Sequence, residues 1–171
     1  MTATRSAAVC DAFPVEVRKA RADEIDVVEE IVEQAYSPYV ARIGRRPGPM
    51  DDDYATRLRE GLVDVAEDDG EILGLIVLVD EGDVLLVENV AVRPASQGRG
   101  VGGELLAHAD RTAARLGRPG LRLYTHSAMT ENIERYTRLG WHETHRRTEH
   151  GFQRVFFSKP TPPRDEGAPI S

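Results

Sequence analysis

Four glycines occupy the six positions from 98 to 103, in the segment Gly98-Arg99-Gly100-Val101-Gly102-Gly103. The interior of a helix or strand does not tolerate glycine at this density, because glycine loses more conformational freedom on folding than any other residue. An apolar run at 84–92, which predicts a strand, precedes the segment, and an amphipathic run at 105–116, which predicts a helix, follows it. The glycines therefore predict a tight connection whose backbone something approaches closely.

Size and composition predict one soluble domain. The chain has 171 residues, of which 40% are hydrophobic and 30% charged, and this is enough for one sizeable core. We expect the domain to span residues 14–159, between a flexible leader at 1–13 and a proline-rich, disordered tail at 160–171. No apolar run approaches the roughly 18 residues that a membrane-spanning helix needs.

Charge and cysteine content restrict the partners and the compartment. Lys and Arg number 22 against 29 Asp and Glu, which gives a formal charge of −7 and argues against binding to nucleic acid or to an anionic membrane. The single cysteine, Cys10, excludes an internal disulfide framework. The five histidines show no metal-ligand spacing. We therefore expect a cytoplasmic protein without a bound metal.

Hydrophobic periodicity predicts an α/β fold with a mixed sheet, antiparallel in its first half. Short acidic turns at 68–70 and 80–83 join neighbouring strands as hairpins. Three prolines and two glycines at 36–50 predict a long loop. The expected strands are 15–19, 63–67, 72–79, 84–92, 121–125, 141–148 and 152–158, and the expected helices are 23–35, 51–61, 105–116 and 130–139.

Read literally, the glycine segment also satisfies the dinucleotide fingerprint GxGxxG. In that fingerprint the glycines follow their strand directly, whereas here the five residues 93–97 intervene. An acidic residue about 20 positions further on should bind the ribose, and 121–126 contains none. A P-loop is excluded because no Gly-Lys-Ser/Thr follows. A glycine-rich helix entry without any ligand remains as the structural alternative.

A second pattern includes the same glycines. Gln97-x-x-Gly100-x-Gly102 follows the strand end Val90-Ala91-Val92-Arg93-Pro94, and a Tyr-x-x-Leu-Gly-aromatic segment runs from Tyr136 to Trp141. Together these motifs, with the order of elements from 15 to about 158, resemble the GNAT superfamily of acetyl-CoA-dependent N-acetyltransferases. The resemblance implies a central, mostly antiparallel sheet that is splayed at the cofactor site and has helices on both faces.

The resemblance also implies acetyl-CoA as co-substrate. Backbone N–H groups of the glycine segment and the positive end of the following helix would hold the diphosphate, and the strand end would bind pantetheine, with the Val90 N–H facing the thioester oxygen. Many relatives carry an asparagine where this chain has Met129, and Asn132 lies one turn later. The cofactor-binding residues implied are Val90, Ala91, Val92, Gln97, Gly98, Arg99, Gly100, Val101, Gly102, Gly103 and Asn132.

Acetyl transfer requires a base that takes a proton from the ammonium form of the acceptor, and an acid that protonates the leaving thiolate. Period-2 alternation places Glu88 on the side of the strand that carries Val90 and Val92, which makes it the candidate base. Its alternative role is a bond within the sheet. Tyr136 matches the tyrosine that the family often uses as the acid, and its alternative role is packing on a helix.

The acceptor is a primary amine of a small molecule or a peptide. Aromatic and apolar residues around the 36–50 loop would bind it, and the candidates are Tyr36, Tyr39, Met50 and Tyr54, all of which could instead pack in the core. Arg42, Arg45 and Arg46 would favour an acceptor with a carboxylate.

Two functions follow from these residues. The first is direct acetyl transfer in a ternary complex, and the second is a non-catalytic GNAT-like module that senses acyl-CoA or serves in an assembly. Retention of both Glu88 and Tyr136 favours the enzyme. A homodimer is consistent with the resembled family.

Overall fold

The computed structural model describes residues 15–163. The leader expected at 1–13 and the tail from 164 onward lie outside the described residues. Among the helices within 15–163, none combines the length and the apolar character needed to cross a membrane.

Seven strands form one sheet in the order β1-β2-β3-β4-β5-β7-β6. Every neighbouring pair is antiparallel except β4 and β5, which are parallel because α3 connects them. This confirms the predicted mixed, mostly antiparallel sheet. The strands are β1 (Glu16–Lys19), β2 (Val63–Asp68), β3 (Glu71–Asp80), β4 (Leu85–Val92), β5 (Gly120–His126), β6 (His142–Glu149) and β7 (Phe152–Pro160).

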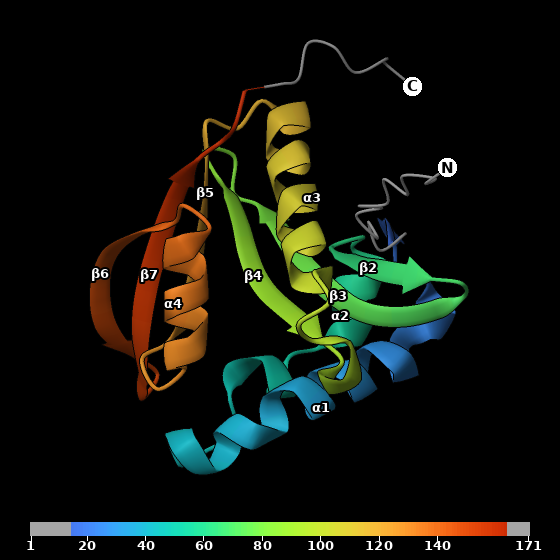
Figure 1. Ribbon diagram of the computed structural model, residues 1–171, viewed down its shortest axis with the longest axis horizontal. Helices are drawn as coiled ribbons and strands as arrows, with labels where there is room; N and C mark the ends of the chain where they lie inside the picture. Colours follow the sequence, from blue (N-terminus) through green and yellow to red (C-terminus); the bar gives the residue numbers. More distant parts are fainter. Residues whose placement is uncertain (1–14, 164–171) are drawn as a thin grey trace, which may run out of the picture.

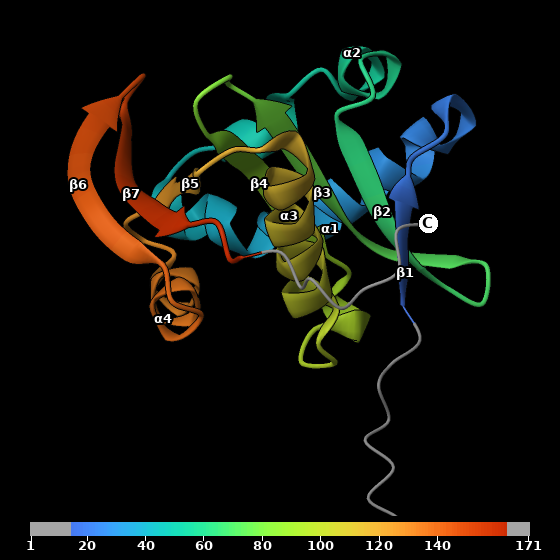
Figure 2. The ribbon, with the colours of Figure 1, turned by 90° about the horizontal axis from the view of Figure 1, so that it is seen from above.

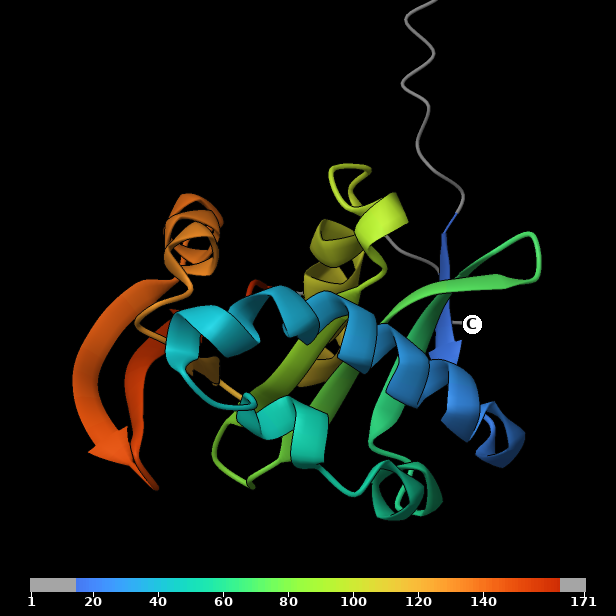
Figure 3. The same cartoon turned by 90° about the horizontal axis from the view of Figure 1, so that it is seen from below.

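Helices cover both faces of the sheet, as predicted. α3 (Val101–Leu116) lies against one face, and α4 (Thr130–Arg138) packs into the same hydrophobic cluster through Ile133 and Tyr136. α1 (Ile25–Ile43) crosses the other face beside α2 (Tyr54–Arg59), over a second cluster. Figure 1 shows α3 in front of the sheet, Figure 2, seen from above, shows α1 beneath the strands, and Figure 3, seen from below, shows α1 crossing in front of them.

The prediction of a loop from 36 onward was wrong, because α1 continues to Ile43 with Pro38 in its interior. Pro38 is exposed, so its ring lies on the solvent side of the helix. The apolar period that begins at Val28 continues through Tyr36 and Ile43, which face the sheet. Gly44 ends the helix in the left-handed region, with φ of 84° and its N–H bonded to the Val40 carbonyl.

Two further boundaries differ from the prediction. α3 begins at Val101, four residues earlier than expected, so that Gly102 and Gly103 belong to its first turn. β7 extends to Pro160, and Thr161 donates hydrogen bonds to the carbonyl oxygens of Arg118 and Pro119. The tail is therefore ordered at these two positions, where β7 runs beside β5.

Candidate active site

β4 and β5 diverge along their length. They pair only from Leu85↔Leu121 to Val87↔Leu123, and beyond Val87 the described strands share no register. Figure 1 shows β4 turning away from β5 and β7 below this point. The sheet is therefore splayed on the carboxyl side of β4, as predicted.

A β-bulge in β4 coincides with the start of the splay. Val77 pairs with Asn89 and Leu78 pairs with Val87, so Glu88 is the extra residue. Glu88 and Asn89 consequently both face α1 and α2, whereas Val90 and Val92 pack in the cluster under α3. The expected alternation, which placed Glu88 on the side of Val90 and Val92, was wrong because one inserted residue shifts the period.

The open edge of β4 presents backbone groups to the gap. The Arg93 N–H bonds to the Leu73 carbonyl on β3, at 2.8 Å. Because successive residues of a strand point their N–H and C=O groups to opposite edges, Val90 and Val92 point theirs away from β3. The Val90 carbonyl accepts a bond from the Tyr36 hydroxyl at 3.3 Å, and the Val92 carbonyl accepts one from Gln97 Nε2 at 3.2 Å. The N–H groups of Val90 and Val92 remain directed into the gap.

The glycine segment joins this edge to α3. Gly98 and Gly100 have φ of 79° and 85°, in the left-handed region that favours glycine. Gly102 and Gly103 are helical, and a Cβ at Gly102 would meet nothing closer than 3.8 Å, while one at Gly103 would meet nothing within 4 Å. Neither backbone conformation nor packing within the described residues requires glycine at 102 and 103. The first N–H groups of α3 lack partners within the helix, as at any helix N-terminus.

A cavity of about 330 Å³ lies in the splay, between β4 on one side and β5, α4 and the β6–β7 hairpin on the other. Five of the predicted site residues line it, namely Tyr36, Glu88, Val90, Asn132 and Tyr136, whereas Tyr39, Met50 and Tyr54 do not. The other lining residues are Ile43, Pro47, Gly48, Pro49, Asp51, Asp52, Val87, Asn89, Leu123, Tyr124, Thr125, His126, Met129, Phe152 and Arg154.

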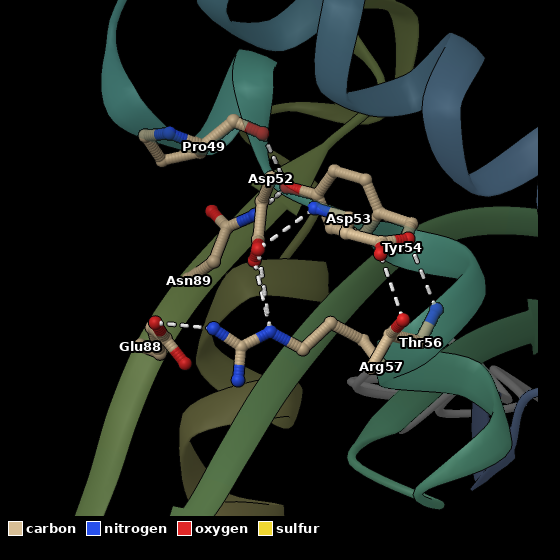
Figure 4. A network of polar contacts seen from close by, with 8 residues as sticks. All are labelled: Pro49, Asp52, Asp53, Tyr54, Thr56, Arg57, Glu88 and Asn89. Carbon is tan, nitrogen blue, oxygen red and sulfur yellow. Dashed lines mark hydrogen bonds and ion pairs between the residues drawn. The ribbon is translucent and has the colours of Figure 1, made fainter.

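Glu88 shares an arginine with a second carboxylate. Arg57 on α2 lies between them, with Nη2 2.8 Å from Glu88 Oε1 and Nε 3.1 Å from Asp52 Oδ2 (Figure 4). Burial raises the pKa of Glu88 above its ordinary value, and the Arg57 guanidinium opposes this increase without cancelling it. A carboxylate with a raised pKa and a wall position in a cavity is suited to accept a proton.

Asn89 links α1 and α2 to the β4 wall of the cavity. Its Oδ1 accepts the Tyr36 hydroxyl, and its Nδ2 donates to the Tyr54 hydroxyl at 3.0 Å. Tyr54 in turn donates to the Pro49 carbonyl (Figure 4). Tyr54 is 2% exposed, so its predicted contact with the acceptor is wrong, because the ring belongs to the core under α1.

Tyr136 packs between two aromatic rings while it lines the cavity. Its ring centroid lies 6.2 Å from that of Trp141 and 5.8 Å from that of Phe157. Burial raises the pKa of Tyr136 to about 12, so its hydroxyl is protonated at neutral pH. The ring is therefore packed, as the alternative role predicts, and Tyr136 also lines the cavity.

Two of the three arginines at 42–46 are engaged in ion pairs. Arg42 pairs with Glu131, and Arg46 pairs with Glu33 and Asp51. Arg45 instead lies over the Phe152 ring, with its guanidinium carbon 3.8 Å from the centroid. None of the three lines the cavity.

Sequence reasoning missed Asn89, Arg57 and Arg154. Asn89 carried a signal, since two adjacent polar residues, Glu88 and Asn89, interrupt an apolar strand and this pattern indicates a bulge. Arg57 and Arg154 carried none, because each is an ordinary charged residue on a helix or a strand. His126, at the end of β5, accepts the Ala128 N–H at Nδ1, and burial lowers its pKa.

Known proteins show the same fold. The paiA N-acetyltransferase of Thermoplasma acidophilum, solved in complex with coenzyme A, matches with a TM-score of 0.73 and 16% identity over 85% of this chain and 98% of that one. The ribosomal-protein-S18-alanine N-acetyltransferase of Escherichia coli gives 0.71 and 17% over 91% and 99%. An IAA acetyltransferase of Bacillus cereus gives 0.65 and 21% over 85% and 99%. No curated protein sequence matches the chain.

The sequence itself matches a family model over residues 59–143, from the end of α2 to the start of β6. That model is described as an acetyltransferase (GNAT) domain. The matched segment contains β4 with its bulge, the glycine segment, β5 and α4. β4 and β5 form the splay, and residues of β4, β5 and α4 line one part of the cavity. The chain belongs to the GNAT superfamily of acetyltransferases.

Proposed function

We propose that this acetyltransferase moves the acetyl group of acetyl-CoA directly to the primary amine of a small molecule or peptide bound in the cavity. The observation that carries the proposal is the open edge of β4, where the N–H groups of Val90 and Val92 face the gap. That edge leads through the glycine segment into the N-terminus of α3. This continuous surface offers N–H donors along β4, where they suit the amides of pantetheine, and N–H donors at the N-terminus of α3, where they suit a phosphate.

Coenzyme A fits this surface. Residues 97–103 would hold the diphosphate through backbone N–H groups, and the missing side chains at Gly102 and Gly103 leave the room that a close approach needs. Val90 and Val92 would bind the pantetheine amides. Bound acetyl-CoA supplies the activated acetyl group, and the Val90 N–H would stabilise the charge that develops on the thioester oxygen. Asn132, at the cavity wall, would contact the same ligand.

Glu88 would take the proton that the acceptor must lose. An alkyl ammonium cannot attack a carbonyl carbon, so its nitrogen has to be deprotonated directly or through a water molecule. Since only ionised Glu88 can accept a proton, the rate should rise with pH through the pKa of this carboxyl. Burial raises that pKa, so the acid limb of the profile should lie above the ordinary range of glutamate. Removing Arg57, which opposes the increase, should shift the limb to still higher pH.

Tyr136 would return a proton to the leaving thiolate. Burial raises the pKa of Tyr136 to about 12, so the phenol carries its proton at neutral pH, although the same burial makes it a weaker acid than an ordinary phenol. Contacts with Trp141 and Phe157 hold the ring, and Tyr136 lines the cavity.

Calorimetric titration with acetyl-CoA, with NADH and ATP as parallel ligands, tests the cofactor. Release of thiol from acetyl-CoA with a panel of amines then tests catalysis. Glu88→Gln or Tyr136→Phe should reduce the rate at least about tenfold, whereas Glu143→Gln, an exposed carboxylate on β6, should leave it unchanged. Unchanged rates in both variants would refute the roles of Glu88 and Tyr136. Tight binding of acetyl-CoA with no transfer to any amine would instead favour the non-catalytic sensing module.

A further inference from the structure

Two charged clusters reach the cavity, one through Asp52 and Glu88 and the other through Arg154. The acidic cluster consists of Asp52, Arg57 and Glu88, from the segment before α2, from α2 itself and from β4. The basic cluster consists of Arg147, Glu149 and Arg154, from the β6–β7 hairpin. Because the cavity separates β4 from β5 and the hairpin, Glu88 and Arg154 belong to its two sides.

Each cluster has one charge in excess. In the acidic cluster a single guanidinium serves two carboxylates, at 2.8 Å and 3.1 Å, which leaves a formal charge of −1. In the basic cluster a single carboxylate, Glu149, serves two guanidiniums, and this leaves a formal charge of +1. A charge at the cavity that is not fully neutralised by a partner within the protein attracts an opposite charge from a ligand.

Arg154 is the member of the basic cluster that reaches the cavity. It lines the wall with its side chain 20% exposed, whereas Arg147 is 55% exposed and stacks over Phe156 outside the cavity lining. Arg154 donates one N–H to Glu149, with Nη1 2.7 Å from Oε2. A guanidinium carries five N–H groups, so Arg154 can donate further N–H groups to a second carboxylate.

Aromatic rings fix the direction of Arg154. Its guanidinium carbon lies 4.5 Å from the centroid of Tyr124 and 5.9 Å from that of Phe152, and both rings line the cavity. Arg45 covers the same Phe152 ring at 3.8 Å and adds a second positive charge on this side. The pKa of Tyr124 is raised by burial, lowered by Arg154, and raised by Glu88 and Asp52, so this phenol lies in the field of both clusters.

We propose that the acceptor is a small zwitterion, in which a carboxylate that accompanies the primary amine is bound by Arg154 while the ammonium faces the acidic cluster. The proposal rests on the proposed function. A carboxylate matches the planar guanidinium fork, which can bind both of its oxygens. An acceptor with two positive charges would place one of them beside Arg154, and a like-charge contact of this kind is unfavourable. The two excess charges therefore select opposite charges on a single molecule.

A panel of α-, β- and γ-amino acids, each paired with its own carboxamide, tests the proposal in the thiol-release assay. The amide keeps the amine and removes only the negative charge. We expect the best acid to exceed its amide in kcat/KM by about 10- to 100-fold, through KM, which is the effect of a hydrogen bond between charged groups. Arg154→Gln should abolish the preference by raising KM for the acid, since a uniform binding contact acts on KM.

Two variants serve as controls. Arg154→Lys keeps the charge but loses the fork, so it should retain an intermediate preference. Arg146→Gln removes an arginine that pairs with Glu143 on the exposed side of β6, and it should keep the full preference. Equal turnover of acid and amide in the wild type, or an unchanged preference in Arg154→Gln, would overturn the proposal and leave the proposed function intact. If no acid and no amide reacts but another amine accepts acetyl, the zwitterion proposal is overturned and the proposed function stands. If no amine of any kind reacts, the proposed function is refuted, and the zwitterion with it.

Discussion

Replacement of Asn89 by alanine should destabilise the protein by about 2 kcal/mol. Asn89 is 5% exposed and joins the phenols of Tyr36 and Tyr54. The change removes both hydrogen bonds, and each is worth about 0.5 to 1.5 kcal/mol net. The phenols keep other acceptors, because Tyr36 still reaches the Val90 carbonyl and Tyr54 still reaches that of Pro49, so no large penalty for an unpaired hydroxyl is added.

The free energy of unfolding can be measured in urea through the fluorescence of Trp141, the one tryptophan of the chain, which is 2% exposed. A loss of about 2 kcal/mol corresponds to a fall in Tm of about 4 to 8 °C for a domain of this size. Asn132→Ala is the matched control, because Asn132 contacts only the Met129 sulfur at 3.6 Å and its loss should change stability by less than about 0.5 kcal/mol.

The rate of acetyl transfer is a second measurement on the Asn89→Ala variant. Asn89 follows the bulge residue Glu88 directly, so loss of its bonds should loosen the wall that holds the carboxylate and should lower kcat. A free energy of unfolding for Asn89→Ala within about 0.5 kcal/mol of the wild type would refute the reasoning. It would mean that the bulge is held by the strand pairing alone and that the phenols are satisfied by water.

Three further changes probe the frame of the site. Gly74→Ala should cost about 1 to 3 kcal/mol in urea unfolding, because the new Cβ would lie 2.8 Å from a backbone oxygen of β4. Gly100→Ala should cost about 1 to 2 kcal/mol, since its φ is 85°, and it should also weaken acetyl-CoA binding in calorimetry. Asp64→Asn should destabilise at pH 7: burial would raise the pKa of Asp64, but bonds from His108 and Lys19 hold it below its ordinary value, so the ionised form stabilises the fold. That difference should disappear as the pH falls below the ordinary pKa of aspartate, and its persistence there would contradict the linkage.

Much of the fold was predictable because local patterns agree with the final structure. The apolar strand at 84–92, the glycines that follow it and the helix after them require only neighbours in sequence, and they were identified correctly. The extent of α1 was not predictable in this way. Pro38 indicates the end of a helix locally, but its ring is exposed, and Tyr36, two residues earlier, packs in the cluster under α1 and bonds to Asn89 and Val90 of β4. Tertiary packing decided whether the helix ends before Pro38 or continues past it, and a single sequence does not contain that information.

The site was predictable where it depends on the backbone and unpredictable where it depends on pairs of distant side chains. Gln97 and the glycines lie where the motif placed them, because their positions follow from one strand and one helix. Arg57 and Glu88 are 31 residues apart, and their contact depends on the angle of α2 to the sheet. Arg154 reaches the cavity because β7 lies beside β5, a pairing that the chain order alone does not fix.

The bulge explains why the splay and the acidic wall occur at one point. β4 pairs with β5 up to Val87, and the extra residue in β4 is Glu88. A bulge increases the local twist of its strand, and this turns the rest of β4 away from β5 and opens the gap. The same insertion moves the Glu88 side chain to the face of α2, where Arg57 holds it at the wall of the gap. One irregularity in the register therefore accounts both for the room that an acceptor needs and for the carboxylate proposed to deprotonate it.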